Sequence, residues 1–180
     1  MLTISVPATE FFDEKSQTFI STKACVLNLE HSLVSLSRWE SKWKKPFLSA
    51  NEKTREESLD YVRCMTINTV DPLVYTALTP LQMQQINDYI SDPMTATTIN
   101  DRRKGRGGSR EIVTSELIYY WMVAYQIPFE CQKWHLGRLM TLIRVCDVKN
   151  APAQKIPKGS LMSRNKSLNA ARRASMGTKG

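Results

Sequence analysis

The spacing of apolar residues along the chain changes character after about the first thirty positions. The stretches LTISV and KACVLNLE alternate apolar and polar residues, and a polar stretch containing FFDEKSQ separates them. Alternation of this kind is typical of strands, so the two stretches predict a small hairpin or a pair of edge strands. Apolar residues then recur at Leu33, Leu36, Trp39 (or Glu40) and Trp43, and Pro46 ends the pattern. This wider spacing predicts a helix over residues 32–44.

Capping residues mark two further helices. Thr54 is followed three residues later by Glu57, which is the pattern of a capping box, and the pair predicts a helix from Arg55 to Met65. The dipeptides Asp71-Pro72 and Thr79-Pro80 each place an N-cap residue before a proline at the first helical position. They predict a helical turn, followed by a full helix that ends before Pro93.

The most apolar part of the chain is SREIVTSELIYYWMVAYQI. It predicts a helix that begins with Ser109 as N-cap and, being apolar almost all round from Leu117 onward, is buried on most sides. Pro128-Phe129-Glu130 then predicts a break and a restart, which would give a tight helical hairpin. On the second helix of this hairpin, helical spacing places one apolar side at Cys131, His135, Leu139, Leu142 and Cys146.

Together these elements predict a mainly α protein. We expect a mostly helical globular domain over residues 1–149, with a short N-terminal β element, and a flexible basic C-terminal tail over residues 150–180. The formal charge of +8 is concentrated in that tail: residues 1–148 hold 17 basic and 17 acidic residues, whereas residues 149–180 hold eight basic residues and no acid. Within the tail, only SRNKSLNAARRASM is predicted to form a helix, and it would need a partner for stability.

Basic residues also gather in the segment NDRRKGRGGSR, residues 100–110, which we expect to be a flexible loop. Both this loop and the tail could contact nucleic acid through phosphates. However, neither segment contains an aromatic residue on which a base could stack, and residues 1–148 as a whole are neutral. A solvated tail, or a tail that docks on an acidic protein surface, is therefore favoured over a nucleic-acid partner.

The sequence contains few groups suited to catalysis. Its only histidines, His31 and His135, lie near no nucleophile elbow, phosphate loop or paired carboxylates, so we expect a non-enzymatic protein without a cofactor. Cys131 and His135 are four residues apart and could form a thiolate with its base, or half a metal site. Packing of both in the core is favoured, because a third ligand or an orienting group is lacking.

The chain carries no signal for a membrane or for export. No run reaches the roughly 18 apolar residues that span a bilayer, and the N-terminus lacks a basic region followed by an apolar stretch. The four cysteines form no CxxC pair, so we expect thiols. A cytosolic protein is predicted.

Trp39 and Trp43 stand four residues apart within a run of charges, SLSRWESKWKKPF. Helical spacing puts both rings on one face together with Leu36. Two interpretations remain open at this point. The rings anchor the helix in the core, against the helical hairpin, or they form an exposed binding patch of the kind found at interface hot spots. The core interpretation is favoured because tryptophan is highly buried on average.

Three segments resemble proteins encoded in the tail-gene cluster of long-tailed, non-contractile bacteriophages. They are SLSRWESKWKKPFL (Ser35 to Leu48), the segment from Ser109 to Cys146, and SRNKSLNAARRA (Ser163 to Ala174), and together they cover about a third of the chain. Proteins similar to these are usually assigned as tail assembly chaperones. The resemblance therefore implies a small helical protein without catalytic activity.

As the resemblance implies, the partner would be the tape measure protein, kept competent while tail tube protein polymerises around it in the host cytoplasm. A homo-oligomer is left open. The residues predicted to bind a partner are Trp39, Trp43, Phe47, Arg164, Lys166, Arg172 and Arg173. Two alternatives are a structural protein of the virion, such as a head–tail connector or tail component, and, less favoured, a small nucleic-acid-binding protein.

Overall fold

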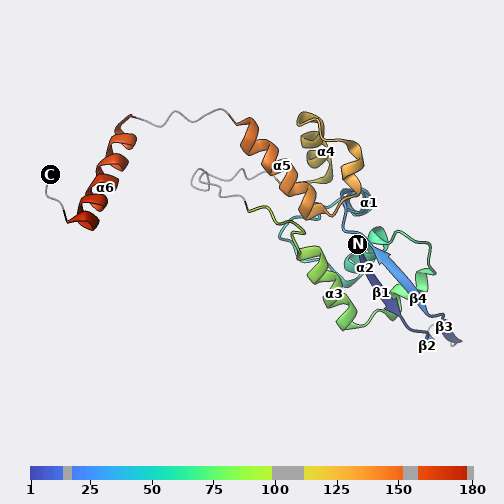
Figure 1. Ribbon diagram of the computed structural model, residues 1–180. Helices are drawn as coiled ribbons and strands as arrows, with labels where there is room; N and C mark the ends of the chain where they lie inside the picture. Colours follow the sequence, from blue (N-terminus) through green and yellow to red (C-terminus); the bar gives the residue numbers. More distant parts are fainter. Residues whose placement is uncertain (14–17, 99–111, 152–157, 178–180) are drawn as a thin grey trace. The chain divides into compact units, whose positions relative to one another are not determined.

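A computed structural model describes residues 1–13, 18–98, 112–151 and 158–177. It confirms a mainly helical protein that opens with a short β element (Figure 1). The chain divides into two compact units, residues 1–147 and residues 148–180. Among the described residues, no helix combines the length and the apolar character that a bilayer-spanning segment requires.

The β element is a single long antiparallel hairpin with an interruption. Strand β1 (Leu2–Val6) pairs with β4 (Cys25–Leu29), so of the two arrangements that the sequence left open the hairpin forms. The stretch between them, which we expected to be a polar connection, adds β2 (Thr9–Asp13) and β3 (Thr18–Thr22), which also pair. Partner residue numbers add up to 31 in both ladders, so the register continues across the interruption. Pro7, which has no N–H to donate, lies at this break.

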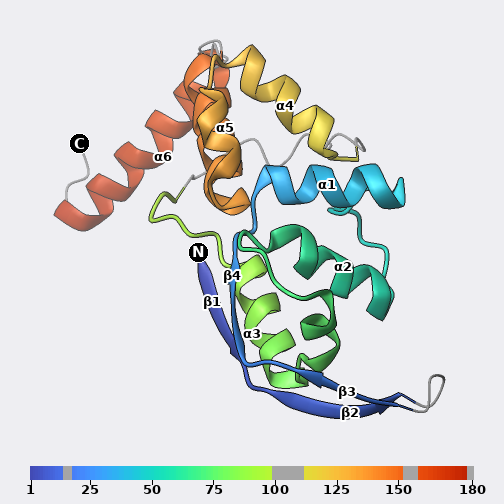
Figure 2. The ribbon, with the colours of Figure 1, turned by 90° about the vertical axis from the view of Figure 1, so that its right-hand side faces the viewer.

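Helices α1 (Leu33–Trp43) and α2 (Arg55–Met65) match their predicted ranges to within one residue. Ser32 caps α1, and α1 ends at Lys44 in the left-handed conformation. The predicted capping box of Thr54 and Glu57 is present at the start of α2. Figure 2 shows α1 lying between α2 and α4, and α1 packs against both.

The proline-marked elements also form as predicted. The 3₁₀ helix η1 (Pro72–Ala77) begins at the Asp71 cap, and α3 (Pro80–Ser91) begins at a capping box of Thr79 and Gln82. α3 packs against β1. The segment that follows α2 extends the sheet. Ile67 donates its N–H to the Asn28 carbonyl, and the side-chain amide of Asn68 accepts from Asn28 N–H and donates to the Val26 carbonyl.

The two helices expected to form a tight hairpin differ from the prediction in where they begin and in whether they are continuous. α4 runs from Ser115 to Ala124, and Thr114 holds its N-cap position in an extended conformation, so Ile112 and Val113, although described, are not helical. Such β-branched residues are stiff and disfavour a helical start. The predicted N-cap Ser109 and the basic loop of residues 100–110 lie outside the described residues.

The chain after α4 is also divided where one helix was expected. The 3₁₀ helix η2 (Phe129–Lys133) is followed by α5 (Leu136–Asn150). Between them the backbone is extended, because Leu136 N–H donates to the His31 carbonyl and His135 forms a β-bridge with Ser32. Cys131 therefore lies on η2, and the buried residues of α5 are Leu136, Leu139 and Ile143.

The second unit contains α6 (Lys158–Met176). The sequence predicted a short helix within residues 163–176, and the observed helix begins five residues earlier. All its described side chains are exposed. The core of the first unit gathers residues from β1, β4 and α1 to α5, and its largest fully buried side chains are Trp39 and Tyr61.

Candidate functional site

Trp39 and Trp43 join α1 to α2. Trp39 is 1% exposed, and its indole N–H donates to the Glu57 carbonyl at 2.9 Å. One turn later the indole N–H of Trp43, which is half-buried, donates to the Asp60 carboxylate at 2.9 Å. The two rings stack with their centroids 6.2 Å apart. Because Trp39 and Trp43 are four residues apart, their indole N–H groups donate to residues on two successive turns of α2.

Ion pairs also connect α1 and the residues just after it to α2. Lys42 pairs with Asp60, and Lys45 pairs with the buried Glu57. The hydrogen bond from Lys45 is the main cause that lowers the pKa of Glu57. Phe47 is also buried and stacks on Tyr61 with centroids 3.8 Å apart. Trp39 and Phe47 consequently offer no exposed ring to a partner, and their packing supports the core interpretation, although the helix that they contact is α2 and not the expected helical hairpin.

The four basic residues predicted to bind a partner lie elsewhere, in the second unit. Arg164, Lys166, Arg172 and Arg173 are all exposed on α6. Between Lys158 and Met176 the helix carries five basic residues and no acid. It also exposes Met162, Leu168 and Met176. These residues make α6 a cationic helix with interspersed apolar side chains.

Cys131 and His135 are both buried but do not form a catalytic pair on one helix. The ring Nε2 of His135 faces the Tyr89 carbonyl at 3.1 Å, and its Nδ1 accepts from Gly137 N–H at 3.2 Å. A carbonyl can only accept, so His135 carries its proton on Nε2, and both ring nitrogens are occupied. Within the described ranges, no group of three or more His, Cys, Asp or Glu residues is arranged to hold a metal ion.

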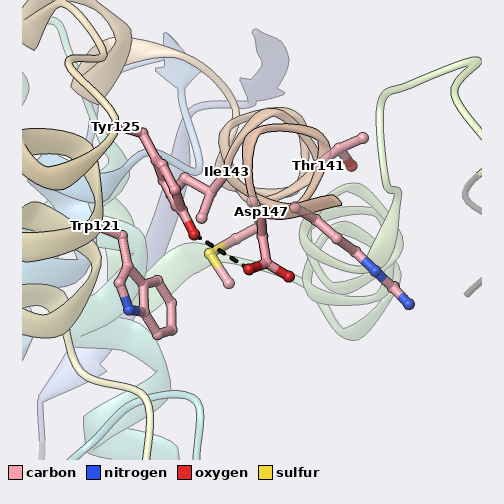
Figure 3. A pocket seen from close by; sticks show the side chains of 7 residues that line it. Trp121, Tyr125, Thr141, Ile143 and Asp147 are labelled. Atoms are coloured by element: carbon pink, nitrogen blue, oxygen red, sulfur yellow. Dashed lines mark hydrogen bonds between the residues drawn. The ribbon is translucent and has the colours of Figure 1, made fainter. Parts of the chain in front are cut away.

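A groove between α4 and α5 is the site that the sequence did not predict. It has a volume of about 470 Å³ and is lined by Trp121, Tyr125, Met140, Thr141, Ile143, Arg144 and Asp147. Figure 3 shows Trp121 and Tyr125 reaching from α4 toward α5, with Asp147 opposite them. The Tyr125 hydroxyl donates to the Asp147 carboxylate at 3.3 Å. The two helices are therefore bridged by a polar contact at one end and separated by a mostly apolar groove.

α4 exposes far more apolar surface than the sequence suggested. Only Ser115, Ile118 and Met122 are buried, on the side that faces α1. Tyr120 is 65% exposed and Val123 is 61% exposed. The prediction that α4 is buried on most sides is therefore wrong, because in the described chain only α1 packs closely along it.

Glu40 fixes the position of α4. This residue belongs to the run of charges around the tryptophans, yet it is buried. One carboxylate oxygen accepts from Phe47 N–H at 2.8 Å, and the other accepts from Ser115 N–H at 2.7 Å. Thr114 gives α4 no side-chain cap, so Glu40 supplies the missing acceptor at the helix N-terminus.

A surplus of apolar residues in α4 is the sequence signal that could have revealed this groove, although we interpreted it as burial on most sides. The ten residues of α4 include two tyrosines, a tryptophan and one charged side chain, Glu116. A two-layer helical domain of this size buries only one stripe of each surface helix, so the remaining apolar residues must face solvent or a partner. Comparison of the chain with protein-family models, curated proteins and solved structures gave no match.

Proposed function

We propose that this protein is a non-enzymatic tail assembly chaperone of a long-tailed, non-contractile bacteriophage, and that it binds the tape measure protein through the groove between α4 and α5. The observation that carries the proposal is the exposed apolar surface of α4 together with this groove. Nearly all of the groove lies within the segment Ser109 to Cys146, the longest of the three segments that resemble such proteins.

The chemistry of the groove suits a helical partner. A tape measure protein is a long helical chain with apolar stripes, which aggregates unless the stripes are covered. Grooves of this kind bind the apolar face of an amphipathic helix through side chains spaced by three and four. Trp121 and Tyr125 are spaced by four on one wall, and Met140 and Ile143 are spaced by three on the other.

α6 would supply a second contact. Its five basic residues and exposed Met162, Leu168 and Met176 suit an acidic helix with apolar side chains. Arg164, Lys166, Arg172 and Arg173 are the residues that we assign to this contact. The chaperone acts in the host cytoplasm and leaves the tail as tail tube protein polymerises around the tape measure protein.

Co-expression with the tape measure protein tests the proposal. We expect that protein to be soluble with the wild-type chain and to aggregate with the double variant Trp121→Ala, Tyr125→Ala. The matched control is Leu81→Ala, which removes a 71% exposed side chain on α3 and should leave the partner soluble. Circular dichroism of each variant establishes that it is folded. A tape measure protein that is equally soluble without this chain would overturn the proposal.

Mass spectrometry of purified particles separates the proposal from the structural alternative. A chaperone should be absent from mature virions, whereas a connector or tail component should be present in a fixed copy number. Detection at a fixed copy number would therefore contradict the assignment as a chaperone.

A further inference from the structure

A second cavity lies between α2 and α3, outside the groove described above. Figure 2 shows these two helices as neighbours, and the cavity between them has a volume of about 200 Å³. Three of its wall residues, Tyr61, Val62 and Ile86, are at most 2% exposed, so the α2–α3 cavity reaches the core. Its apolar wall residues come from α2, α3 and the connection between α1 and α2, and they are Phe47, Tyr61, Val62, Met83, Ile86 and Ile90.

Two hydroxyl groups in the walls of this cavity already have hydrogen-bond partners. The Tyr61 hydroxyl lies 2.6 Å from Nδ1 of His31, and the Ser58 hydroxyl donates to the Thr54 carbonyl at 2.9 Å. Neither group therefore requires a water molecule in the cavity. Apolar cavities of about 150 Å³ stay dry and bind benzene. The α2–α3 cavity is of comparable size, so it accepts an apolar group as large as one ring.

Lys53 places a positive charge at the rim of the α2–α3 cavity. Its side chain is half-buried, and its Nζ lies 4.4 Å from the centroid of the Phe47 ring. Tyr61 stacks on one face of that ring, so the ammonium group lies over the other face. Lys42 and Lys45 each pair with an acid on α2, whereas Lys53 has no carboxylate within ion-pair distance in the described part of the chain. A ring face attracts the charge but replaces no strong acceptor, and the three donors of the ammonium group are left for a ligand.

We propose that the α2–α3 cavity binds a small apolar carboxylic acid. The apolar part of the ligand lies against Met83, Ile86 and Ile90, and its carboxylate accepts hydrogen bonds from Nζ of Lys53. Asn87, which is exposed on α3, adds a carboxamide to the same rim. Sites for small molecules commonly combine mostly apolar walls with a few polar groups that fix the orientation of the ligand.

The volume and the charge together define the class of ligand. Sites for drug-sized molecules begin at roughly 300 Å³, so a cavity of about 200 Å³ limits the ligand to about one ring or a short alkyl chain. A cation without an acidic partner at the rim favours an anion over a neutral molecule of the same shape. This ligand site goes beyond the proposed function, because it lies outside the groove assigned to the tape measure protein.

Methyl NMR spectroscopy of the full chain, titrated with benzoate, tests the proposal. The methyl groups of Val62, Met83, Ile86 and Ile90 should shift together and reach saturation. Benzyl alcohol, which has the same ring but no charge, should shift the same methyl groups and bind about tenfold more weakly, because hydrogen bonds to charged groups are the stronger ones.

Three variants separate the charge from the cavity. Lys53→Met keeps an unbranched stem without the charge, so benzoate should bind it no more tightly than benzyl alcohol does, and the affinity for benzyl alcohol should not change. Lys133→Met makes the same exchange at an exposed site on η2 and should bind both probes like the wild type. Ile90→Phe adds a ring to the wall and should abolish the saturable shifts of both probes, with circular dichroism to establish that it is folded.

The outcomes that would overturn the proposal are equally specific. They are the absence of a saturable shift with benzoate, shifts confined to methyl groups outside the cavity, and a preference for benzoate that Lys53→Met retains. Binding that a folded Ile90→Phe variant retains would contradict it as well. The titrations require only the purified chain, so their result is independent of the co-expression experiment with the tape measure protein.

Discussion

At the scale of single residues, the tryptophan pair illustrates how a binding motif and a packing motif can look alike in sequence. Trp39 and Trp43 stand among five charged residues, yet both indole N–H groups donate to α2, and two of the neighbouring lysines pair with acids on the same helix. The charges therefore complete a joint between two helices. Helical spacing predicted the shared face correctly, but the sequence could not show that α2 supplies acceptors at matching turns.

Replacement of Trp39 measures how much the contact between α1 and α2 contributes to stability. Trp39→Ala should lower the free energy of unfolding by about 3–5 kcal/mol, because it empties a fully buried site and leaves the Glu57 carbonyl without its donor. Trp43→Ala should cost less, since that ring is only half-buried. Urea denaturation of both variants gives the comparison. Equal small losses would contradict the core role of Trp39.

His31 gives the protein a pH-dependent stability. Burial, followed by the neighbouring His135, lowers the pKa of His31 from 6.5 to about 3. Its ring accepts or donates a hydrogen bond with the Tyr61 hydroxyl at 2.6 Å. Because the unfolded chain binds a proton near pH 6.5 and the folded chain does not, stability is complete above pH 6.5 and falls as the pH drops toward 3.

The expected loss from this residue between pH 7 and pH 5 is about 2 kcal/mol. Denaturation curves over that range should show a much smaller loss for His31→Gln, which keeps a hydrogen-bonding side chain but does not titrate. The carboxyl groups with lowered pKa values, Glu57, Asp60 and Glu116, act in the same direction only at lower pH. Parallel curves for wild type and variant would show that His31 is not the cause.

At the scale of elements, the positions of caps and prolines predicted most helices well, whereas tertiary contacts decided the rest. α1, α2, η1 and α3 follow from local signals that the structure retains. The start of α4 depends on Glu40, which is 75 residues away along the chain. The end of η2 depends on a bridge to Ser32. Both contacts join residues far apart in the chain, so no local sequence pattern predicts them. The positions of α4 and α5, and therefore the groove between them, depend on these contacts.

Glu40 provides a test of the anchoring of α4. Glu40→Gln exchanges one accepting oxygen for an amide donor, so either Phe47 N–H or Ser115 N–H loses its acceptor. We expect a loss of about 1–3 kcal/mol in the free energy of unfolding. Hydrogen exchange at these two amides should be faster in the variant. Glu116→Gln, at an exposed site in the first turn of α4, should change stability by less than about 1 kcal/mol. Unchanged exchange in Glu40→Gln would contradict the anchoring role.

Substitution of Gly137 tests how closely α5 packs against the backbone that follows α3. A Cβ at this position would lie 3.0 Å from the Pro93 carbonyl oxygen and 3.1 Å from that of Asp92. Gly137→Ala should therefore destabilise the fold by about 1–3 kcal/mol despite the better helix propensity of alanine.

The matched control is Gly159→Ala on α6, where no atom lies within 4 Å. That substitution should raise helicity by circular dichroism, because only the propensity gain applies, about 1 kcal/mol. A stabilising effect of Gly137→Ala in thermal unfolding would show that the close approach is absent.

At the scale of the whole molecule, the chain combines a neutral helical body with a separate cationic helix. Sequence reasoning located the charge and the mainly helical fold. The aromatic residues that it named as a possible binding patch, Trp39, Trp43 and Phe47, pack against α2, for a physical reason: spacing identifies a shared face but not what that face contacts. In α4, Trp121 and Tyr125 are the aromatic residues that line an open groove.

Site-specific photo-crosslinking tests this account most directly. A benzoylphenylalanine in place of Trp121 keeps a large aromatic group in the groove, and the same residue in place of Leu81 on α3 serves as the control. In cells that make both proteins, we predict an adduct between position 121 and the tape measure protein, and none from position 81. Equal adducts from both positions, or no adduct from position 121 while the two proteins co-purify, would contradict the groove as the binding site.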